Sequence, residues 1–132
     1  MLYALLCYNS EEIVGSWSKQ EDDEIMARLT VINDRLQREG KLGPTARLMP
    51  TTAATTLRKA GKGRRLEASS EPPTVLDGPY AETKEQLLGF YLVDCKNLEE
   101  ALSITKELAV ANPGGAYEIR PVSLFLPGSG VT

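Results

Sequence analysis

The sequence predicts a mixed α+β fold of the ferredoxin-like type, in which two helices cover one face of a four-stranded antiparallel sheet and a β-hairpin is inserted. Strand and helix patterns follow one another in the order strand, helix, hairpin region, strand, helix, strand. Two strand candidates, Leu2–Tyr8 and Leu87–Asp94, are apolar on both alternating faces, which is typical of strands covered on both sides. The 132 residues suit one domain, which we expect over residues 1–126 with a tail at 127–132.

The first helix is predicted after a break in the chain at Asn9–Gly15. Ser18 and Glu21 suit a capping box, in which each side chain accepts a hydrogen bond from the other's backbone N–H. Gly40 is expected to end the helix in the left-handed conformation, and Trp17 to be a packing anchor before the cap. The stripe that this helix buries is predicted from helical spacing as Ile25, Leu29, Ile32 and Leu36.

The middle of the chain is predicted to contain short β-segments. A turn at Gly61–Gly63 is expected to bring the two strands beside it together as an antiparallel pair. The prolines of Ser69–Pro73 indicate a loop, since proline cannot donate to a strand ladder. The expected strands of this region are Ala46–Met49, Thr52–Leu57, Arg64–Ala68 and Val75–Leu76.

The second helix is predicted to begin at an Asn97 cap and to stop at the Asn-Pro-Gly-Gly sequence of Asn112–Gly115. The last strand is expected at Ala116–Leu126. Its apolar phase slips at Pro121, which indicates a bulge or an edge there. The buried stripe of the second helix is predicted as Leu98, Ala101, Leu102, Thr105, Leu108 and Ala109.

Two helices cover only one face of such a sheet, yet Leu2–Tyr8 and Leu87–Asp94 are apolar on both faces. The hairpin at residues 52–68 is expected to cover part of the second face. A second copy of the chain is expected to cover the rest, because an exposed apolar patch of this kind favours association. We therefore predict a homodimer with a two-fold axis.

Composition excludes several classes of partner and cofactor. The net charge of −3 argues against a nucleic-acid partner, which needs a basic surface. No apolar run reaches the roughly 20 residues of a membrane span, and the N-terminus lacks the basic lead-in of a secretory signal. Cys7 and Cys95, in a chain without histidine, cannot make a zinc site or a disulfide framework. We expect no metal or cofactor, and two cysteines that act as small buried apolar residues.

A family resemblance appears at the run DGPYAETKEQ, Asp77–Gln86, which is followed by Gly89-Phe90-Tyr91. This run closely resembles the DGPF motif that names a group of small bacterial proteins within the YCII-related family. The opening strand, Ala54–Arg58 and Glu118–Val122 share the likeness. The resemblance implies a ferredoxin-like fold of the dimeric α/β-barrel type that dimerises through its sheets. It also implies a cytoplasmic protein.

No activity is firmly assigned to the family that the motif resembles. Some similar proteins are encoded beside extracytoplasmic-function sigma factors, and others have been proposed to be enzymes with a histidine and an aspartate in a pocket. The present chain has no histidine, so this pair cannot operate here. It also has Tyr80 where the motif has phenylalanine, and a longer segment between Arg58 and Asp77.

The candidate catalytic residues are Asp77, Glu82 and Lys84. Without histidine, a general base near neutral pH must be a carboxylate with a raised pKa, a lysine with a lowered pKa or a thiolate. Asp77 is either such a base or a hydrogen-bond partner of its own turn. Glu82 and Lys84 either pair at the entrance of a strand or share one face at the mouth of a pocket.

The candidate ligand-binding residues are Arg58, Tyr80, Tyr91 and Arg120. The two arginines either bind a small anionic ligand or offset nearby acidic residues. The tyrosines, together with Tyr3, either line an apolar cavity or pack in the core.

Two functions therefore remain open on the sequence alone, and whether the protein is an enzyme is undecided. One is a pocket for a small anionic or polar molecule between the sheet and the 52–68 hairpin, near Asp77, Glu82 and Lys84. The other is a noncatalytic accessory or regulatory protein with a partner related to sigma factors. The fold cannot choose between them.

Overall fold

The chain folds into two units, which we describe separately. The computed structural model describes residues 1–60, 68 and 70–130. One unit comprises Met1–Leu48 and Glu85–Thr132 and is called here the sheet unit. The other comprises Met49–Lys84 and is called the hairpin unit.

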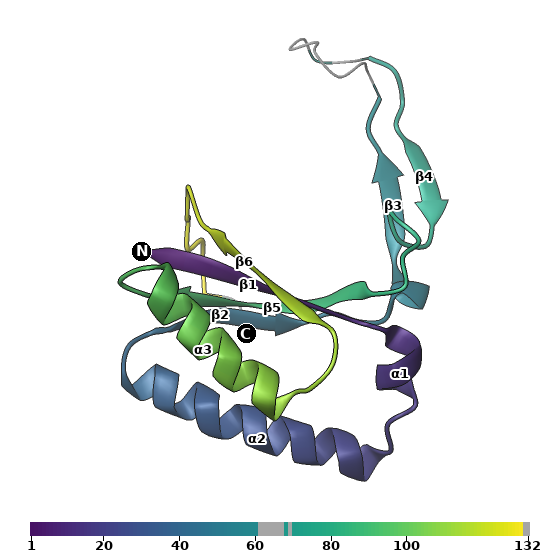
Figure 1. Cartoon of the computed structure of the whole chain (residues 1–132). Coiled ribbons are helices and arrows are strands. Elements are labelled where there is room, and N and C mark those ends of the chain that lie inside the picture. Colours follow the sequence, from purple (N-terminus) through teal and green to yellow (C-terminus); the bar gives the residue numbers. More distant parts are fainter. Residues whose placement is uncertain (61–67, 69, 131–132) are drawn as a thin grey trace. The chain divides into compact units, whose positions relative to one another are not determined.

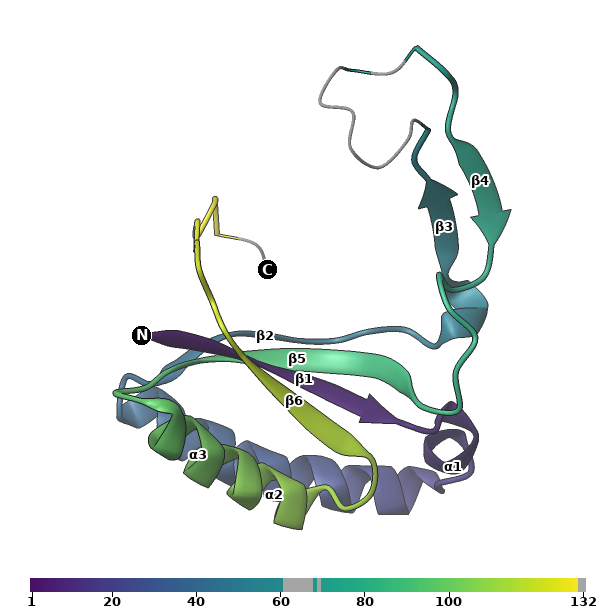
Figure 2. The same cartoon turned by 45° about the horizontal axis from the view of Figure 1, so that its top comes forward.

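The sheet unit has the predicted ferredoxin-like arrangement. Its four strands lie in the order β2-β5-β1-β6, and each neighbouring pair is antiparallel. The helices α2 and α3 lie side by side on one face of this sheet (Figures 1 and 2). The elements along the chain are β1 Leu2–Asn9, α1 Glu11–Gly15, α2 Lys19–Arg38, β2 Leu42–Arg47, β5 Gln86–Asp94, α3 Leu98–Ala111 and β6 Ala116–Pro121.

The core lies between the helices and the sheet face that they cover. On β1 the alternation of side chains directs Tyr3 and Leu5 toward the helices, and both are buried. Their neighbours Ala4 and Leu6 alternate onto the opposite face, which we call the far face, and are only partly buried. The rest of the core comes from β5 and the helices, with Val93, Leu36 and Leu108 fully or almost fully enclosed.

The predicted start and end of the long helix are confirmed. Ser18 caps α2, and its hydroxyl and the Glu21 carboxylate accept hydrogen bonds from each other's backbone N–H. Gly40 follows the helix with φ of 70°, a conformation that glycine adopts without strain. Of the predicted stripe, Ile25, Leu29 and Leu36 are buried and Ile32 packs against the core. Trp17 also packs against the core, as predicted.

The predicted stripe of the second helix, α3, is partly wrong. Asn97 caps the helix as expected, because its side chain accepts a hydrogen bond from the Glu100 backbone N–H. Leu98, Leu102 and Ala109 are exposed, however. The buried line is Ala101, Ile104, Thr105, Leu108 and Ala111. The prediction grouped every apolar residue near one face, whereas contact with α2 and β6 buries only a narrow stripe.

Three further boundaries differ from the prediction. A short helix, α1, follows Asn9 where only a break was expected, and Ser10 caps it. The strand predicted at Ala46–Met49 is β2, which begins at Leu42 and ends at Arg47. The last strand, β6, ends at Pro121 rather than at Leu126, and it is an edge strand as expected. Sequence periodicity marks element centres better than it marks their ends.

The hairpin unit contains a second, two-stranded sheet. The strand β3, Thr55–Arg58, pairs antiparallel with β4, Thr74–Asp77, so that Leu57 lies opposite Val75. The strand predicted at Thr52–Leu57 is β3, but it begins only at Thr55, because a short 3₁₀ helix, η1, occupies Thr51–Ala53. The predicted strand at Val75–Leu76 is therefore confirmed. The turn predicted at Gly61–Gly63 and all but the last residue of Arg64–Ala68 lie outside the described residues.

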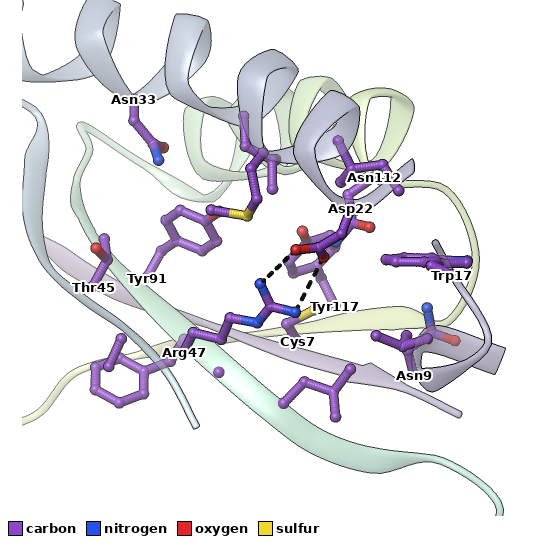
Figure 3. A pocket seen from close by; sticks show the side chains of 18 residues that line it. Cys7, Asn9, Trp17, Asp22, Asn33, Thr45, Arg47, Tyr91, Asn112 and Tyr117 are labelled. Carbon is purple, nitrogen blue, oxygen red and sulfur yellow. Dashed lines mark hydrogen bonds and ion pairs between the residues drawn. The ribbon is translucent and has the colours of Figure 1, made fainter. Parts of the chain in front are cut away.

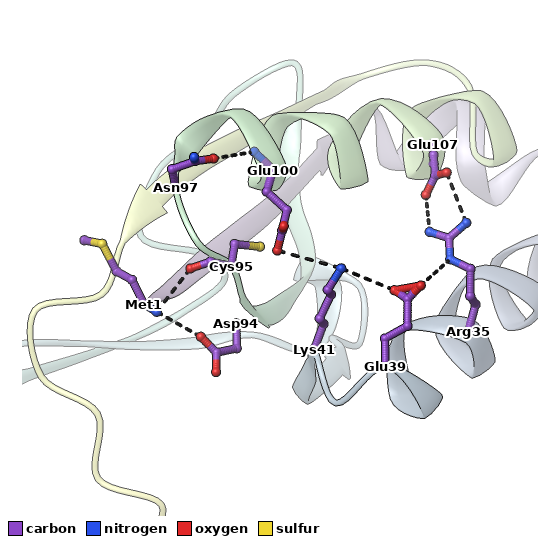
Figure 4. Close-up of polar contacts among 9 residues, drawn as sticks. All are labelled: Met1, Arg35, Glu39, Lys41, Asp94, Cys95, Asn97, Glu100 and Glu107. Atoms are coloured by element: carbon purple, nitrogen blue, oxygen red, sulfur yellow. Dashed lines mark hydrogen bonds and ion pairs between the residues drawn. The ribbon is translucent and has the colours of Figure 1, made fainter.

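Ion pairs connect the helices and strands at the end of the sheet unit where β1 begins (Figure 4). The Arg35 guanidinium on α2 makes a two-pronged contact with the Glu107 carboxylate on α3. The Lys41 ammonium lies 3.4 Å from the Glu39 carboxylate and 3.9 Å from that of Glu100. These groups are partly exposed, so each pair contributes at most about 1 kcal/mol. They link α2 to α3, and they link the segment before β2 to both helix regions.

Candidate functional site

A pocket lies in the sheet unit between α2 and the helix-covered face of the sheet, at the opposite ends of the strands from the ion pairs (Figure 3). Its volume is about 210 Å³. Trp17 closes it on the side of α1, and α2 contributes residues from Asp22 to Asn33. The sheet contributes Cys7, Tyr91 and Tyr117 among others. The pocket is thus built from segments that lie far apart in the sequence.

A β-bulge and a glycine shape the floor of the pocket. Cys7 pairs with Gly89 but Tyr8 pairs with Leu87, so Leu88 is an extra residue in β5. Bulges of this kind bend a strand and redirect its side chains, and they are frequent beside binding sites. A Cβ atom on Gly89 would lie 2.4 Å from the Ala46 carbonyl oxygen of β2. Glycine is therefore required for β2 to approach β5 at this point.

An ion pair spans from α2 to β2 at the pocket (Figure 3). The Arg47 Nη2 atom lies 3.2 Å from the Asp22 Oδ1 atom. The side chain of Arg47 is 59% exposed and that of Asp22 is 33% exposed, whereas Leu29 and Asn9, which also line the pocket, are buried. The pair therefore stands between the pocket interior and solvent, and it joins the helix to the edge strand.

Three buried polar atoms that belong to pocket residues have no hydrogen-bond partner among the described residues. They are the Oδ1 atoms of Asn33 and Asn112 and the hydroxyl oxygen of Tyr117. They come from α2, from the end of α3 and from β6. A buried polar atom without a partner is uncommon in folded proteins, since its desolvation costs about 1–3 kcal/mol. Three such atoms around one cavity indicate a site that a polar ligand or water completes.

The titratable groups deep in the pocket are held in their neutral forms. Burial raises the pKa of Tyr117 well above its usual range, and the nearby Cys7 thiol adds to the increase. The Asn112 amide lies close enough to lower this pKa slightly, although no hydrogen bond of ordinary geometry joins it to the Tyr117 hydroxyl. Burial also raises the pKa of Tyr91 and that of Cys7, while the nearby Asn33 amide opposes the increase at Tyr91 and the Tyr117 hydroxyl opposes it at Cys7. The Cys7 thiol is therefore protonated near neutral pH and is a poor nucleophile.

We expect stability to fall at alkaline pH because of these groups. The folded chain keeps the protons of Tyr91 and Tyr117 above their ordinary pKa of 10.0, whereas the unfolded chain releases them there. The free energy of unfolding should be unaffected by the two phenols below that pH and should fall as pH rises above it. Tyr117→Phe removes one contributor and should make the decline less steep. Urea unfolding between about pH 8 and pH 11 measures this, and equal slopes for both proteins would contradict it.

The sequence-predicted site residues are divided between the two units. Tyr91 is the one that lines the pocket. In the hairpin unit, the Arg58 guanidinium lies over the Tyr80 ring at 5.5 Å from its centroid. The predicted catalytic residues Asp77, Glu82 and Lys84 also belong to the hairpin unit, and all three are exposed.

Arg120, the remaining predicted residue, is exposed on β6 in the sheet unit, where it pairs with Ala4. Its alternation with Tyr117 and Ile119 places it on the far face rather than toward the pocket. Arg120 is therefore not among the pocket residues, and whether it binds a ligand stays a prediction.

Sequence reasoning missed the polar residues of the pocket, although one of them gives a signal. Asn33 follows Leu29 by four residues and precedes Leu36 by three, so it lies on the buried stripe of α2. An amide within an apolar stripe needs a polar partner and is a reason to expect a site. Asn112 gave no such signal, because a residue of its type commonly ends a helix.

The described part of the chain holds no group of three or more cysteine, aspartate or glutamate side chains that could bind a metal ion. Cys7 is partly buried and Cys95 is buried, and both are free thiols. None of the described helices has the length and apolar character that crossing a membrane requires.

Comparison with known proteins supports the resemblance seen in the sequence. The YCII-related domain model matches residues 1–126. A protein of Rhizobium meliloti (strain 1021), described as uncharacterized, is 52% identical over 129 residues. The match covers 97% of each of the two chains.

Proposed function

The chain belongs to the YCII-related domain family, and from this membership and the geometry of the pocket we propose that it is a small-molecule-binding protein. The ligand occupies the pocket between α2 and the sheet. The observation that carries the proposal is that three residues lining one cavity, Asn33, Asn112 and Tyr117, each have a buried polar atom without a hydrogen-bond partner among the described residues. A ligand that satisfies these atoms removes a desolvation cost that no hydrogen bond of ordinary geometry among the described residues offsets.

Binding without catalysis fits the chemistry of the pocket better than an enzymatic role does. The chain has no histidine, and the Cys7, Tyr91 and Tyr117 side chains have raised pKa values. The one carboxylate of the lining, that of Asp22, is ion-paired. Among the lining residues, this leaves no group suited to general acid–base work near neutral pH.

The proposed pocket differs in place from the pocket that the sequence predicts near residues 77–85. That segment lies almost wholly in the hairpin unit, and its candidates Asp77, Glu82 and Lys84 are exposed. The sheet-unit pocket is favoured because three of the residues that line it have buried polar atoms without a partner among the described residues. A ligand site at residues 77–85 stays a prediction.

A pocket-filling substitution tests the proposed function. Met26→Trp places a large side chain on α2 at the pocket, and Val31→Trp makes a similar change at an exposed position of the same helix. Ligand-observed NMR with a library of small fragments should find molecules that bind the wild-type protein and Val31→Trp. Their dissociation constants should rise by at least about tenfold in Met26→Trp. If every fragment binds Met26→Trp as well as wild type, the pocket is not the ligand site.

We also propose that the protein is a homodimer that associates through the far face of the sheet. On this face Leu6 lies directly opposite Phe90 of β5, and Ala4 lies opposite Leu92. On the neighbouring strand β6, Glu118 lies opposite Leu6 and Arg120 lies opposite Ala4. An apolar centre with a charged margin is the usual composition of a protein interface.

Sedimentation equilibrium tests the dimer. The wild-type protein and Leu102→Arg, a change at an exposed position of α3, should sediment with twice the mass of one chain. Leu6→Arg, a change on the far face, should sediment with the mass of one chain because a buried unpaired charge is costly. A wild-type protein that stays monomeric at micromolar concentration would remove this proposal.

A second candidate function is the noncatalytic accessory role, with a partner related to sigma factors. The observation that favours it is the exposure of large apolar side chains on the hairpin unit, where Leu57, Val75 and Tyr80 are 55%, 62% and 76% exposed. Capture experiments with wild type and Leu57→Asp should recover a transcription component only with wild type. Recovery of the same proteins by both would count against this role.

A further inference from the structure

The unpartnered atoms of the pocket define what a ligand must offer. The Oδ1 atoms of Asn33 and Asn112 are hydrogen-bond acceptors only, and the Tyr117 hydroxyl both donates and accepts. All three atoms are buried, so bulk water does not satisfy them. Their complement is a molecule that carries at least one hydrogen-bond donor. A purely apolar molecule would leave both carbonyl oxygens without a partner.

The charges around the pocket indicate a neutral ligand. The Asp22 carboxylate and the Arg47 guanidinium are the two charged groups of the lining, and they neutralise each other at a separation of 3.2 Å. Cys7, Tyr91 and Tyr117 are uncharged near neutral pH, since burial raises the pKa of each. A charged ligand would lose its hydration and would gain no unpaired opposite charge unless it broke the ion pair.

The size and walls of the pocket indicate a single ring. The volume of about 210 Å³ compares with the cavity of roughly 150 Å³ that holds benzene in another protein, which suggests about eight non-hydrogen atoms. Trp17, Tyr91 and Tyr117 are aromatic residues of the lining, and Met26 adds a thioether. Aromatic rings and methionine sulfur both make favourable contacts with a flat ring.

From these observations we propose that the pocket takes a neutral aromatic molecule of about eight non-hydrogen atoms that carries a hydroxyl or amine N–H donor. The hydrogen bond from that donor is accepted by one of the unpartnered oxygens of Asn33, Asn112 and Tyr117. This inference rests on the proposed function, because it names the class of ligand for the same pocket. The sequence alone left an anionic ligand open at Arg58 and Arg120, and neither arginine is a pocket residue.

Three probes of equal size test the proposal. Benzyl alcohol, ethylbenzene and benzylammonium each have about eight non-hydrogen atoms and differ in one group, which is a neutral donor, an apolar methyl or a cation. Dissociation constants are measured at neutral pH by ligand-observed NMR. Benzyl alcohol should bind at least about tenfold more tightly than either of the others, since only it pairs with the buried acceptors without carrying charge.

Two variants test which residues cause the preference for benzyl alcohol. Tyr117→Phe removes only the hydroxyl from the pocket, and it should reduce the preference for benzyl alcohol over ethylbenzene by about threefold or more. Asn112→Leu replaces a carbonyl acceptor with an apolar side chain of similar size, and it should also reduce the preference for benzyl alcohol. Tyr8→Phe makes the same chemical change as Tyr117→Phe at a residue that does not line the pocket, and it should leave the preference as it is.

The outcomes separate this inference from the function on which it rests. Equal or tighter binding of ethylbenzene or benzylammonium overturns the neutral-donor class. So does failure of all three probes to bind, or a preference that Tyr117→Phe and Asn112→Leu leave unchanged. If fragments of another class still lose affinity in Met26→Trp, the pocket remains a ligand site with a different specificity. If no fragment distinguishes Met26→Trp from Val31→Trp, the proposed function fails as well.

Discussion

Gly115→Ala is expected to destabilise the protein by about 3–5 kcal/mol. Gly115 lies just before β6 with φ of 72°, a conformation that costs alanine about 1–2 kcal/mol. The added Cβ would also lie 2.0 Å from the Tyr8 carbonyl oxygen and 3.0 Å from Asn9. These are backbone and buried atoms of β1 that cannot move without disturbing the pairing of β1 with β6. Chemical denaturation measures the loss in free energy of unfolding.

Gly40→Ala is the matched control for this prediction. Gly40 has a similar φ of 70°, but no atom lies within 4 Å of the position of its Cβ. Gly40→Ala should therefore lower the free energy of unfolding only by the conformational cost of about 1–2 kcal/mol. Equal losses for the two substitutions would show that the close approach of Gly115 to β1 has no energetic weight. Since Asn9 lines the pocket, Gly115→Ala should also weaken fragment binding, which Gly40→Ala should leave unchanged.

Leu5→Ala is expected to cost about 3–4 kcal/mol. Leu5 is fully buried between β1 and the helices, so its truncation removes apolar burial and leaves a cavity in a packed core. Thermal or chemical unfolding measures the effect. The loss should be the same at every protein concentration, because the contacts of Leu5 lie within one chain.

Leu6→Ala, at the next position of the same strand, separates core packing from association. Leu6 lies on the far face and is only partly buried within the chain. If the far face is the dimer interface, the cost of Leu6→Ala should be largest at high protein concentration and should shrink as the protein is diluted, because association adds to the stability of the wild-type protein only while the dimer is populated. A small cost that does not vary with concentration would speak against the interface, and a small cost for Leu5→Ala would contradict the core described here.

Local signals were sufficient to predict most of the sheet unit. The capping box of Ser18 and Glu21 and the Asn97 cap are short-range features, and the helices begin where they indicate. The two strands with the two-sided apolar pattern, β1 and β5, are the central strands of the sheet. The bulge at Leu88 could not be predicted, because it depends on the register between strands that lie some eighty residues apart. The short helix α1 was missed because its five residues carry no apolar period.

The pocket was largely beyond sequence reasoning for the same physical reason. Asp22 and Arg47 are 25 residues apart and approach each other only when β2 returns beside α2. Tyr91 was found because a tyrosine in a two-sided apolar strand stands out. Asn112 was interpreted only as part of a helix stop, although its side chain lies in the pocket. The charged residues of the DGPYAETKE run drew attention because they are close in sequence, yet they are exposed.

Both outer strands of the four-stranded sheet carry a proline, Pro44 in β2 and Pro121 at the end of β6. Proline lacks the N–H that an incoming strand would need, so neither margin presents an unbroken row of donors to another molecule. Fibril growth by edge-to-edge stacking is thereby disfavoured. The folded sheet, with its apolar pair of central strands, is thus less prone to amyloid-like growth at its edges.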